Sequence, residues 1–161
     1  MAKVIHAPDN TDNLDKMSIF LAGTIDMGNS LDWQKKITED WEKYDVTFLN
    51  PRRPDWDSDF GSDEVQKQVK WELDAMDKAD IIIVNILEDS ESPITIAETY
   101  RHAGSAKLFV ACPDGFYRYD NISAVCEHYK SALYGSWDEL KEDFEKNLDS
   151  LIEAWEFTNQ D

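Results

Sequence analysis

The most pronounced pattern in this chain is an apolar run at residues 81–86, which reads Ile-Ile-Ile-Val-Asn-Ile. The run is rich in β-branched residues and lacks polar alternation, which is typical of a strand buried on both faces of a parallel sheet. Residues 92–98 then favour a helix start, because Ser92 is a good N-cap, Pro93 suits the first helical position and Gly104 is a natural stop. We therefore expect a central strand followed by a helix whose second turn carries Glu98.

Strand and helix patterns alternate along the rest of the chain. Apolar runs bounded by turn residues predict strands, and apolar residues three or four positions apart predict helices. The expected strands are 17–23, 46–49, 107–112 and a weak 132–134, and the expected helices are 31–43, one from Ser62, 122–129 and a last one from Ser136. This order predicts an α/β fold of three layers, Rossmann- or flavodoxin-like, with a parallel sheet of about five strands.

The helix patterns also predict buried faces. In each helix, apolar residues recur so that they share one side of the cylinder. The last helix also has a capping box, formed by Ser136 and Glu139. The expected buried sets are Trp33, Ile37 and Trp41; Val65, Val69, Leu73 and Met76; and Leu140, Phe144, Leu148, Leu151 and Trp155.

The length of 161 residues favours one compact domain. Residues 1–16 lack apolar periodicity and contain several turn-forming residues. We therefore expect an irregular leader over residues 1–16 and a single domain over residues 17–157.

The charge of the chain limits its partners. It has 34 acidic residues against 16 Lys and Arg, a net charge of −18. Such a field repels phosphate backbones and anionic lipid surfaces, so neither nucleic acid nor a membrane is an expected partner. A small neutral or locally shielded ligand is compatible with it.

Cysteine content and hydropathy give no indication of disulfides, a metal site or a membrane segment. The two cysteines, Cys112 and Cys126, are too few for a disulfide framework and lack the CxxC spacing of a zinc site, so no metal is expected. No signal peptide or apolar run of about 20 residues is present, which predicts a cytoplasmic protein.

Glu98 is the first candidate for chemistry. In an open α/β sheet, ligands bind outside the carboxyl ends of the strands, and Glu98 follows the central strand closely. The loop after the first long strand begins at Gly23 and resembles a phosphate-binding loop, but Asn29 stands where that motif needs Lys. Its glycine indicates either close approach to a small ligand or a tight turn.

Two further positions have a functional and a structural interpretation. Arg52 and Arg53 lie beside Trp56 on a proline-stiffened loop, where they could contact a base or an anion, or could neutralise nearby aspartates. Asp74 lies at the edge of an apolar stripe, near the rim of the expected sheet. The alternative is a surface carboxylate paired with Lys70 or Lys78 one turn away.

Several of these segments together resemble the nucleoside 2-deoxyribosyltransferases and their nucleotide N-glycosidase relatives. The resemblance extends from Ile19 to about Asn121 and depends on the set as a whole. Its anchors are Phe20-Leu21-Ala22-Gly23, Asn50-Pro51-Arg52-Arg53, Trp71-Glu72-Leu73-Asp74 through Ala79-Asp80, and Glu98.

The resemblance implies a mechanism. Glu98 would attack the anomeric carbon of a 2-deoxyribosyl group and form a covalent sugar ester, which a second base or water resolves. Asp74 would handle the proton of the leaving base. No cofactor is implied, and the remaining substrate contacts would come from Gly23, Thr24, Asp26, Asn50, Arg52 and Ser92.

Departures from the family pattern affect the predicted substrate. Ser92 stands where the transferases usually carry an Asp that holds the sugar 5′-hydroxyl, which favours a 5′-monophosphate. Asp26 stands where the phosphate-binding relatives place Arg, which disfavours one. The usual Glu-Ile/Leu-Gly at the nucleophile is replaced by Glu98-Thr99-Tyr100.

The resemblance also implies a homo-oligomer, because family members complete the site with an Asn from a neighbouring subunit. Asn121 lies at about that position. The alternative is that Asn121 caps the helix from Ile122.

Three functions are compatible with these residues. The first is a nucleoside 2-deoxyribosyltransferase that takes a small deoxynucleoside or deoxynucleotide and a free base. The alternative is a 2-deoxynucleoside 5′-monophosphate N-glycosidase with water as acceptor. A second alternative is a non-catalytic nucleotide-binding module.

Overall fold

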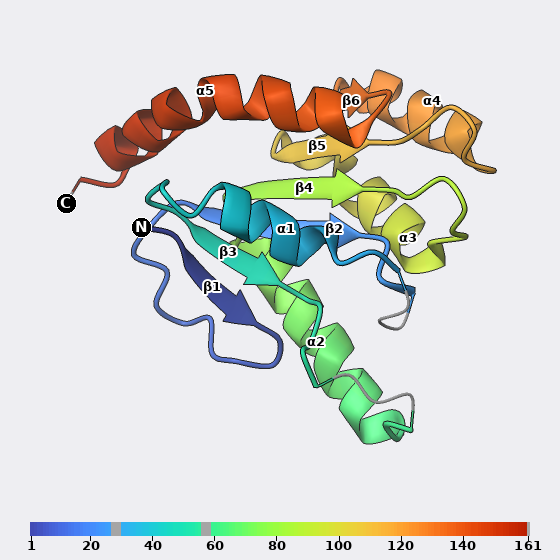
Figure 1. The fold of residues 1–161 in the computed structure, drawn as a ribbon, viewed down its shortest axis with the longest axis horizontal. Helices are drawn as coiled ribbons and strands as arrows, with labels where there is room; N and C mark the ends of the chain where they lie inside the picture. Colours follow the sequence, from blue (N-terminus) through green and yellow to red (C-terminus); the bar gives the residue numbers. More distant parts are fainter. Residues whose placement is uncertain (27–29, 56–58, 161) are drawn as a thin grey trace.

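The computed structural model describes residues 1–26, 30–55 and 59–160. Its centre is a six-stranded sheet in the order β1-β3-β2-β4-β5-β6, in which all paired strands run parallel (Figure 1). This confirms the predicted α/β class and parallel sheet, with one strand more than expected. The strands are β1 Lys3–His6, β2 Ser18–Gly23, β3 Thr47–Asn50, β4 Ile81–Asn85, β5 Leu108–Ala111 and β6 Ala132–Tyr134.

Helices cover both faces of the sheet. One face packs on α1 and α5, and the other packs on α2, α3 and α4. The long α5 runs over one face of the sheet, and α2 extends well beyond the strands (Figure 1). The helices are α1 Trp33–Asp40, α2 Ser62–Lys78, α3 Pro93–His102, α4 Tyr119–Tyr129 and α5 Trp137–Thr158, with a 3-10 turn, η2, at Ala103–Ser105.

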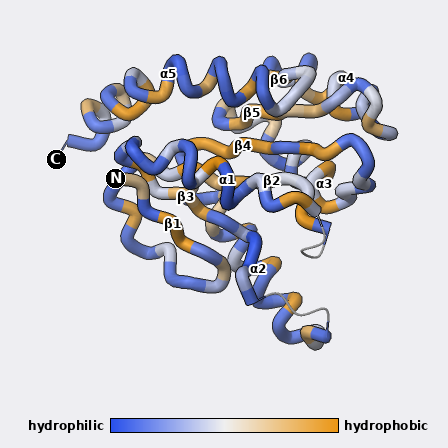
Figure 2. Tube along the Cα trace, viewed as in Figure 1, coloured by the Kyte–Doolittle hydropathy of each residue, from blue (hydrophilic) through white to orange (hydrophobic). Residues whose placement is uncertain are grey.

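Strand β4 is the centre of the sheet, as its apolar run predicts. It pairs with β2 and β5, and all five of its residues are buried. Figure 2 shows the same strand as a hydrophobic band beneath the more hydrophilic α5. Because β4 ends beside Gly23 of β2, its carboxyl end opens directly next to the first loop.

The N-terminal segment corrects one prediction. Residues 1–16 are not irregular throughout, because Lys3–His6 forms β1 and pairs with β3 at the edge of the sheet. Only Ile5 of this strand is buried, so a four-residue edge strand leaves almost no alternation to detect. The sheet therefore begins before residue 17, the predicted start of the domain.

Helix α2 corrects another prediction. Val65, Val69 and Leu73 are 46%, 46% and 41% exposed, whereas Trp71 is buried against Phe20 with ring centroids 6.2 Å apart. The Trp71 indole also donates to the Asp9 carbonyl at 2.7 Å. The helix is therefore turned so that its buried face carries Gln68, Trp71, Ala75 and Met76.

Helix starts agree only in part with the predicted caps. Ser136 accepts from the Glu139 amide at 3.2 Å, which confirms that cap. Asp32 caps α1 through the Lys35 amide, and α2 already includes Ser62 after Gly61. In α5, Leu140, Phe144 and Leu148 are buried, as expected, whereas Leu151 and Trp155 are partly buried at the edge of the core.

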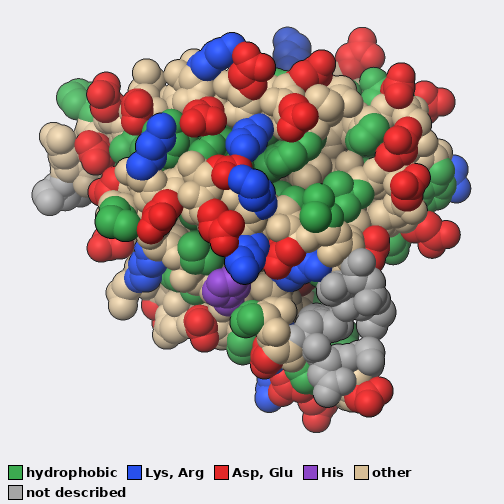
Figure 3. Space-filling model, viewed as in Figure 1, with side chains coloured by type: hydrophobic (Ala, Val, Ile, Leu, Met, Phe, Trp, Pro, Cys, Tyr) green, Lys and Arg blue, Asp and Glu red, His purple; other side chains and the backbone are tan. Residues whose placement is uncertain are grey.

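The surface reflects the acidic composition. Acidic side chains are spread over the face seen in Figure 3, with Lys and Arg between them. Within the described ranges, no helix combines the length and hydropathy needed to cross a bilayer.

Candidate active site

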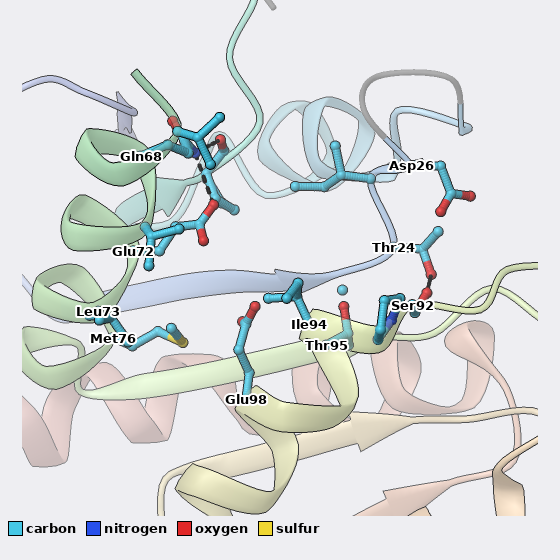
Figure 4. A pocket seen from close by; sticks show the side chains of 16 residues that line it. Thr24, Asp26, Gln68, Glu72, Leu73, Met76, Ser92, Ile94, Thr95 and Glu98 are labelled. Carbon is cyan, nitrogen blue, oxygen red and sulfur yellow. Dashed lines mark hydrogen bonds between the residues drawn. The ribbon is translucent and has the colours of Figure 1, made fainter. Parts of the chain in front are cut away.

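A cavity of about 430 Å³ lies at the carboxyl end of the central strands. Its walls come from four segments: the loop after β2, Pro51 after β3, the outward stripe of α2 and the first two turns of α3 (Figure 4). Val65, Val69 and Leu73, the stripe expected in the core, line this cavity instead. Most of the wall is therefore apolar, and the polar groups on it are few.

Gly23 brings the first loop against the end of β4. Its φ is +140°, and a Cβ built on it would lie 2.2 Å from the Asn85 carbonyl oxygen. Any side chain there would force β2 and β4 apart, so glycine is required by the backbone. The tight-turn interpretation is confirmed. Gly23 also lines the cavity, and close approach of its backbone to a ligand stays a prediction.

Glu98 lies in the cavity, as its position after β4 predicts. Helix α3 points the carboxyl toward the space between α2 and the first loop (Figure 4). Burial, together with the negative charge of Glu72, raises the pKa of Glu98 to about 8, and the charge of Arg101 offsets this only in part. The Arg101 guanidinium itself donates to Asp77 at 2.9 Å.

Glu72 is the second carboxyl in the cavity, and it was not among the residues expected there. Its pKa is raised by burial, an effect opposed by a hydrogen bond from the Gln68 amide at 2.9 Å. Gln68 also donates to the Pro51 carbonyl at 2.8 Å, which fixes its amide. A signal was present in the sequence: Glu72 falls on the same helical stripe as Val65, Val69 and Met76, where a carboxylate is out of place.

Asp74 is not in the cavity, contrary to our prediction. Its side chain is 53% exposed and pairs with Lys70 at 3.1 Å. This is the surface alternative recognised from the spacing. Each helix position is turned by about 100° from the one before it, so Asp74, two positions after Glu72, lies on nearly the opposite side of α2. Its side chain therefore points away from the wall that carries Glu72.

Hydroxyl groups form the polar end of the cavity. The Thr24 and Ser92 hydroxyls lie 2.7 Å apart, and Ser92 donates to the Ser90 hydroxyl at 2.9 Å. Ser90 in turn donates to an Asp26 carboxylate oxygen at 2.7 Å. Ser92 precedes Pro93 with a φ of 43° and makes no side-chain cap, because its hydroxyl belongs to this chain of contacts.

A comparison with protein families matches residues 16–116 to the model described as "Nucleoside 2-deoxyribosyltransferase like". That match covers more than half of the chain. The protein belongs to the nucleoside 2-deoxyribosyltransferase like family. A search of curated proteins found no significant match.

Family membership confirms the resemblance. The structure brings only some of the expected substrate contacts to the cavity. Gly23, Thr24, Asp26 and Ser92 line the cavity. Asn50 is buried beneath the second loop, where its side chain accepts from the Arg52 amide at 2.9 Å. It is absent from the described lining of the cavity.

Arg52 supports the first loop of this family member. Its guanidinium donates to the Ser30 carbonyl at 2.7 Å and the Leu31 carbonyl at 3.0 Å. Arg53 pairs with Asp55 and Glu64, which confirms the neutralising interpretation for that residue. Residues 27–29, including Asn29, lie outside the described residues, as does Trp56, which neighbours the two arginines in the sequence.

Asn121 is exposed in the first turn of α4, outside the described cavity wall. Helix α4 starts at Tyr119, so Asn121 does not cap a helix from Ile122. Its contribution to a neighbouring subunit's site stays a prediction. Across the described residues, no group of three or more His, Cys, Asp and Glu side chains is placed to hold a metal ion.

Proposed function

We propose that this protein cleaves the N-glycosidic bond of 2-deoxynucleosides through a covalent 2-deoxyribosyl ester on Glu98 and transfers the sugar to a second base. The observation that carries this proposal is the pair Glu72 and Glu98. Two carboxyls of raised pKa reach one apolar cavity from different helices. Family membership supports the class of reaction.

The pair supplies one anion and one acid. Burial disfavours two negative charges together, and the pKa of Glu98 at about 8 lies above neutral pH. At neutral pH Glu98 therefore holds a proton, and we propose that Glu72 carries the negative charge beside it. Two carboxyls with separated roles are what glycosidic bond cleavage with retention requires.

In the first step, Glu98 passes its proton to Glu72 and attacks the anomeric carbon. The bond from that carbon to the base nitrogen breaks, and its electron pair stays on the base. Glu72 delivers the shared proton to the base, which leaves neutral. The products are the free base and the sugar ester of Glu98, so charge and protons balance.

The second step reverses the roles. A second base gives its ring proton to Glu72 while its nitrogen attacks the anomeric carbon. The ester oxygen of Glu98 takes back the electron pair, and a new nucleoside leaves. The same ester gives hydrolysis when water replaces the base.

The apolar wall favours both steps. Val69, Leu73 and Ile94 surround the carboxyls with hydrocarbon, which strengthens the attraction between the Glu98 carboxylate and a cation-like sugar. The same surface suits the flat face of a base. Since a stacked base displaces water from this wall, the cavity favours transfer over hydrolysis.

Product analysis tests the proposal. The protein is incubated with deoxynucleosides, with and without a second free base, and the products are separated. New nucleoside formation is expected, together with a trapped 2-deoxyribosyl adduct on the peptide that contains Glu98. Release of free sugar alone would support the glycosidase alternative, and binding without base release would support the non-catalytic module.

A further inference from the structure

We infer that Gln68 is a positioning residue of the proposed reaction, which presents Glu72 with a hydrogen-bond donor and so makes Glu72, rather than Glu98, the charged member of the carboxyl pair. The inference rests on the proposed function for the use that the reaction makes of this arrangement. Its basis is the way in which the Gln68 amide is fixed between two acceptors.

The Gln68 amide lies between the loop after β3 and Glu72. Its nitrogen donates to the Pro51 carbonyl at 2.8 Å and to Oε1 of Glu72 at 2.9 Å. Gln68 is only 6% exposed, although it lines the cavity. An amide nitrogen has two protons, and these two contacts use both of them.

The Pro51 carbonyl fixes the direction of the contact with Glu72. A backbone carbonyl can only accept, so the nitrogen of Gln68, and not its oxygen, has to face Pro51. The opposite orientation of the amide would set its oxygen against the Pro51 oxygen and remove that hydrogen bond. The amide oxygen is buried without a hydrogen-bond partner among the described residues, so the nitrogen contacts hold the side chain. Gln68 therefore meets Glu72 as a donor.

A donor in this position favours the charged form of Glu72. A hydrogen bond to a carboxylate is stronger than one to a neutral acid. Burial raises the pKa of Glu72, and the Gln68 amide opposes that rise. Glu98 has no such donor within the described part of the chain, and burial, with the charge of Glu72, raises its pKa to about 8. The two carboxyls thus differ in the support that their negative charge receives.

The other charges near the pair do not produce this difference. The charged side chains on the described cavity wall are three carboxyls, those of Asp26 from the loop after β2, Glu72 from α2 and Glu98 from α3. The loop after β3 contributes only Pro51 to that wall. Arg101 lowers the pKa of Glu98 in part, but its guanidinium donates to Asp77 at 2.9 Å. Gln68 is therefore the described donor that distinguishes Glu72 from Glu98.

The same contact orients the Glu72 carboxyl. Figure 4 shows this carboxyl between Gln68 and Glu98, with the dashed contact on the side of Gln68. Because Oε1 accepts from Gln68, Oε2 is left for the proton that passes between the pair and the base. A stabilised Glu72 anion also makes protonated Glu72 a stronger acid toward the leaving base.

This arrangement predicts an acid limit for turnover. The proposed reaction needs one proton on the pair, because protonation of both carboxyls leaves no nucleophile. The pair takes up its second proton at Glu72, so the donor from Gln68 moves that step to lower pH. Loss of the donor should therefore move the acid side of the active range toward neutral pH.

A titration of Glu72 tests the inference without any turnover. In Glu98→Gln, Glu72 is the one ionisable member of the pair, and carbon-13 NMR follows its carboxyl through the signal that Glu72→Gln removes. Gln68→Met deletes the donor at nearly the same side-chain length, and the pKa of Glu72 should rise, by roughly one pH unit. Gln68→Lys supplies a charged donor, so the pKa of Glu72 should fall.

Gln66→Met is the matched control. Gln66 is exposed on the same helix and outside the described cavity wall, so the same substitution there should leave the titration of Glu72 unchanged. A role of Gln68 in packing alone would change melting temperatures without moving this pKa. A pKa of Glu72 that ignores Gln68→Met, or that moves in the same direction in Gln68→Met and Gln68→Lys, would overturn the inference.

The pH profile of base release, measured with Glu98 in place, connects this titration to turnover. The acid limb of kcat/KM should move to higher pH in Gln68→Met and to lower pH in Gln68→Lys. An acid limb that does not follow the titration of Glu72 would also overturn the inference. Absence of base release by the wild-type protein would remove the proposed catalysis, and the titration would still decide the role of Gln68. Base release with a Glu72 titration that is independent of Gln68 would do the reverse.

Discussion

Glu72 of α2 and Glu98 of α3 face the same cavity (Figure 4). Burial, and after it the charge of Glu72, raises the pKa of Glu98. The two residues are 26 positions apart in the sequence, on helices that follow β3 and β4. The proposed chemistry depends on this coupling between the two carboxyls.

The first prediction concerns the nucleophile. Glu98→Gln keeps nearly the same volume but cannot form the sugar ester, so we expect base exchange to fall by about 10³-fold or more while nucleoside binding persists. Exchange rates and binding titrations measure this. Glu91→Gln, on the exposed loop before α3, is the matched control and should retain activity. Near wild-type turnover in a folded Glu98→Gln variant would exclude the covalent mechanism.

The second prediction separates Glu72 from Asp74. Glu72→Gln removes the proposed proton carrier, and we expect turnover to fall by roughly 10²-fold or more. Asp74→Asn, on the same helix but paired with Lys70 at the surface, should stay within about twofold of the wild type. A larger effect of Asp74→Asn than of Glu72→Gln would restore the role that the resemblance gave to Asp74.

The pH dependence of turnover tests the shared proton. Activity should decline above about pH 8, because the Glu98 and Glu72 pair then loses the proton that the leaving base needs. In Glu72→Gln the negative charge that raises the pKa of Glu98 is gone, so the residual activity should decline at lower pH. A pH profile of kcat/KM measures both midpoints. An unchanged alkaline limb in Glu72→Gln would contradict the coupling.

The protonation of Glu98 should also make the stability of the protein depend on pH. The pKa of Glu98 rises from 4.5 to about 8 on folding, so the folded protein holds this proton where the unfolded chain has lost it. Its stabilising contribution is complete below pH 4.5 and is lost as pH rises to about 8. The Gln side chain in Glu98→Gln does not titrate, so the variant does not lose stability as pH rises through this range. It should therefore be more stable than the wild type at pH 8, by an amount on the order of a few kcal/mol. Melting temperatures at pH 5 and pH 8 measure it, and a difference that does not grow with pH would contradict the assignment.

Gly23→Ala tests the close approach of the first loop. Its Cβ would lie 2.2 Å from the Asn85 carbonyl oxygen at a φ of +140°, so we expect a loss of roughly 3 kcal/mol or more in the free energy of unfolding. Gly61→Ala is the control, because a Cβ there meets nothing within 4 Å. Chemical denaturation compares the two. Equal stability of both variants would mean that β2 and β4 adjust easily.

The parts of the fold that the sequence predicted are those where burial leaves a periodic trace. Strand β4 is buried on both sides, so its run of Ile residues is visible in the sequence, and the position of Glu98 follows from the connection to α3. Strand β1 has only Ile5 buried, and its pairing with β3 depends on residues more than 40 positions away.

The side chains of the site were harder to assign because periodicity cannot distinguish core from cavity. Val65, Val69 and Leu73 have the spacing of a buried stripe, yet they face an open cavity because α2 extends past the sheet. Once this stripe is assigned to a cavity wall, Glu72 rather than Asp74 becomes its acidic member. The contacts of Arg52 with the carbonyls of Ser30 and Leu31 leave no signal in the sequence. Every residue has a backbone carbonyl, so the identity of residues 30 and 31 does not indicate that they accept these hydrogen bonds.

The edge strand β1 has a practical consequence for handling the protein. The family match begins at residue 16, so a shortened chain that starts there would retain every matched position and lose β1. The backbone of Thr47–Asn50, now hydrogen-bonded to Lys3–His6, would then present free amide and carbonyl groups along an apolar strand. Unpaired strand edges of this kind recruit other chains. A truncation chosen from the family boundary is thus expected to aggregate, even though it leaves the cavity and both of its carboxyls in place.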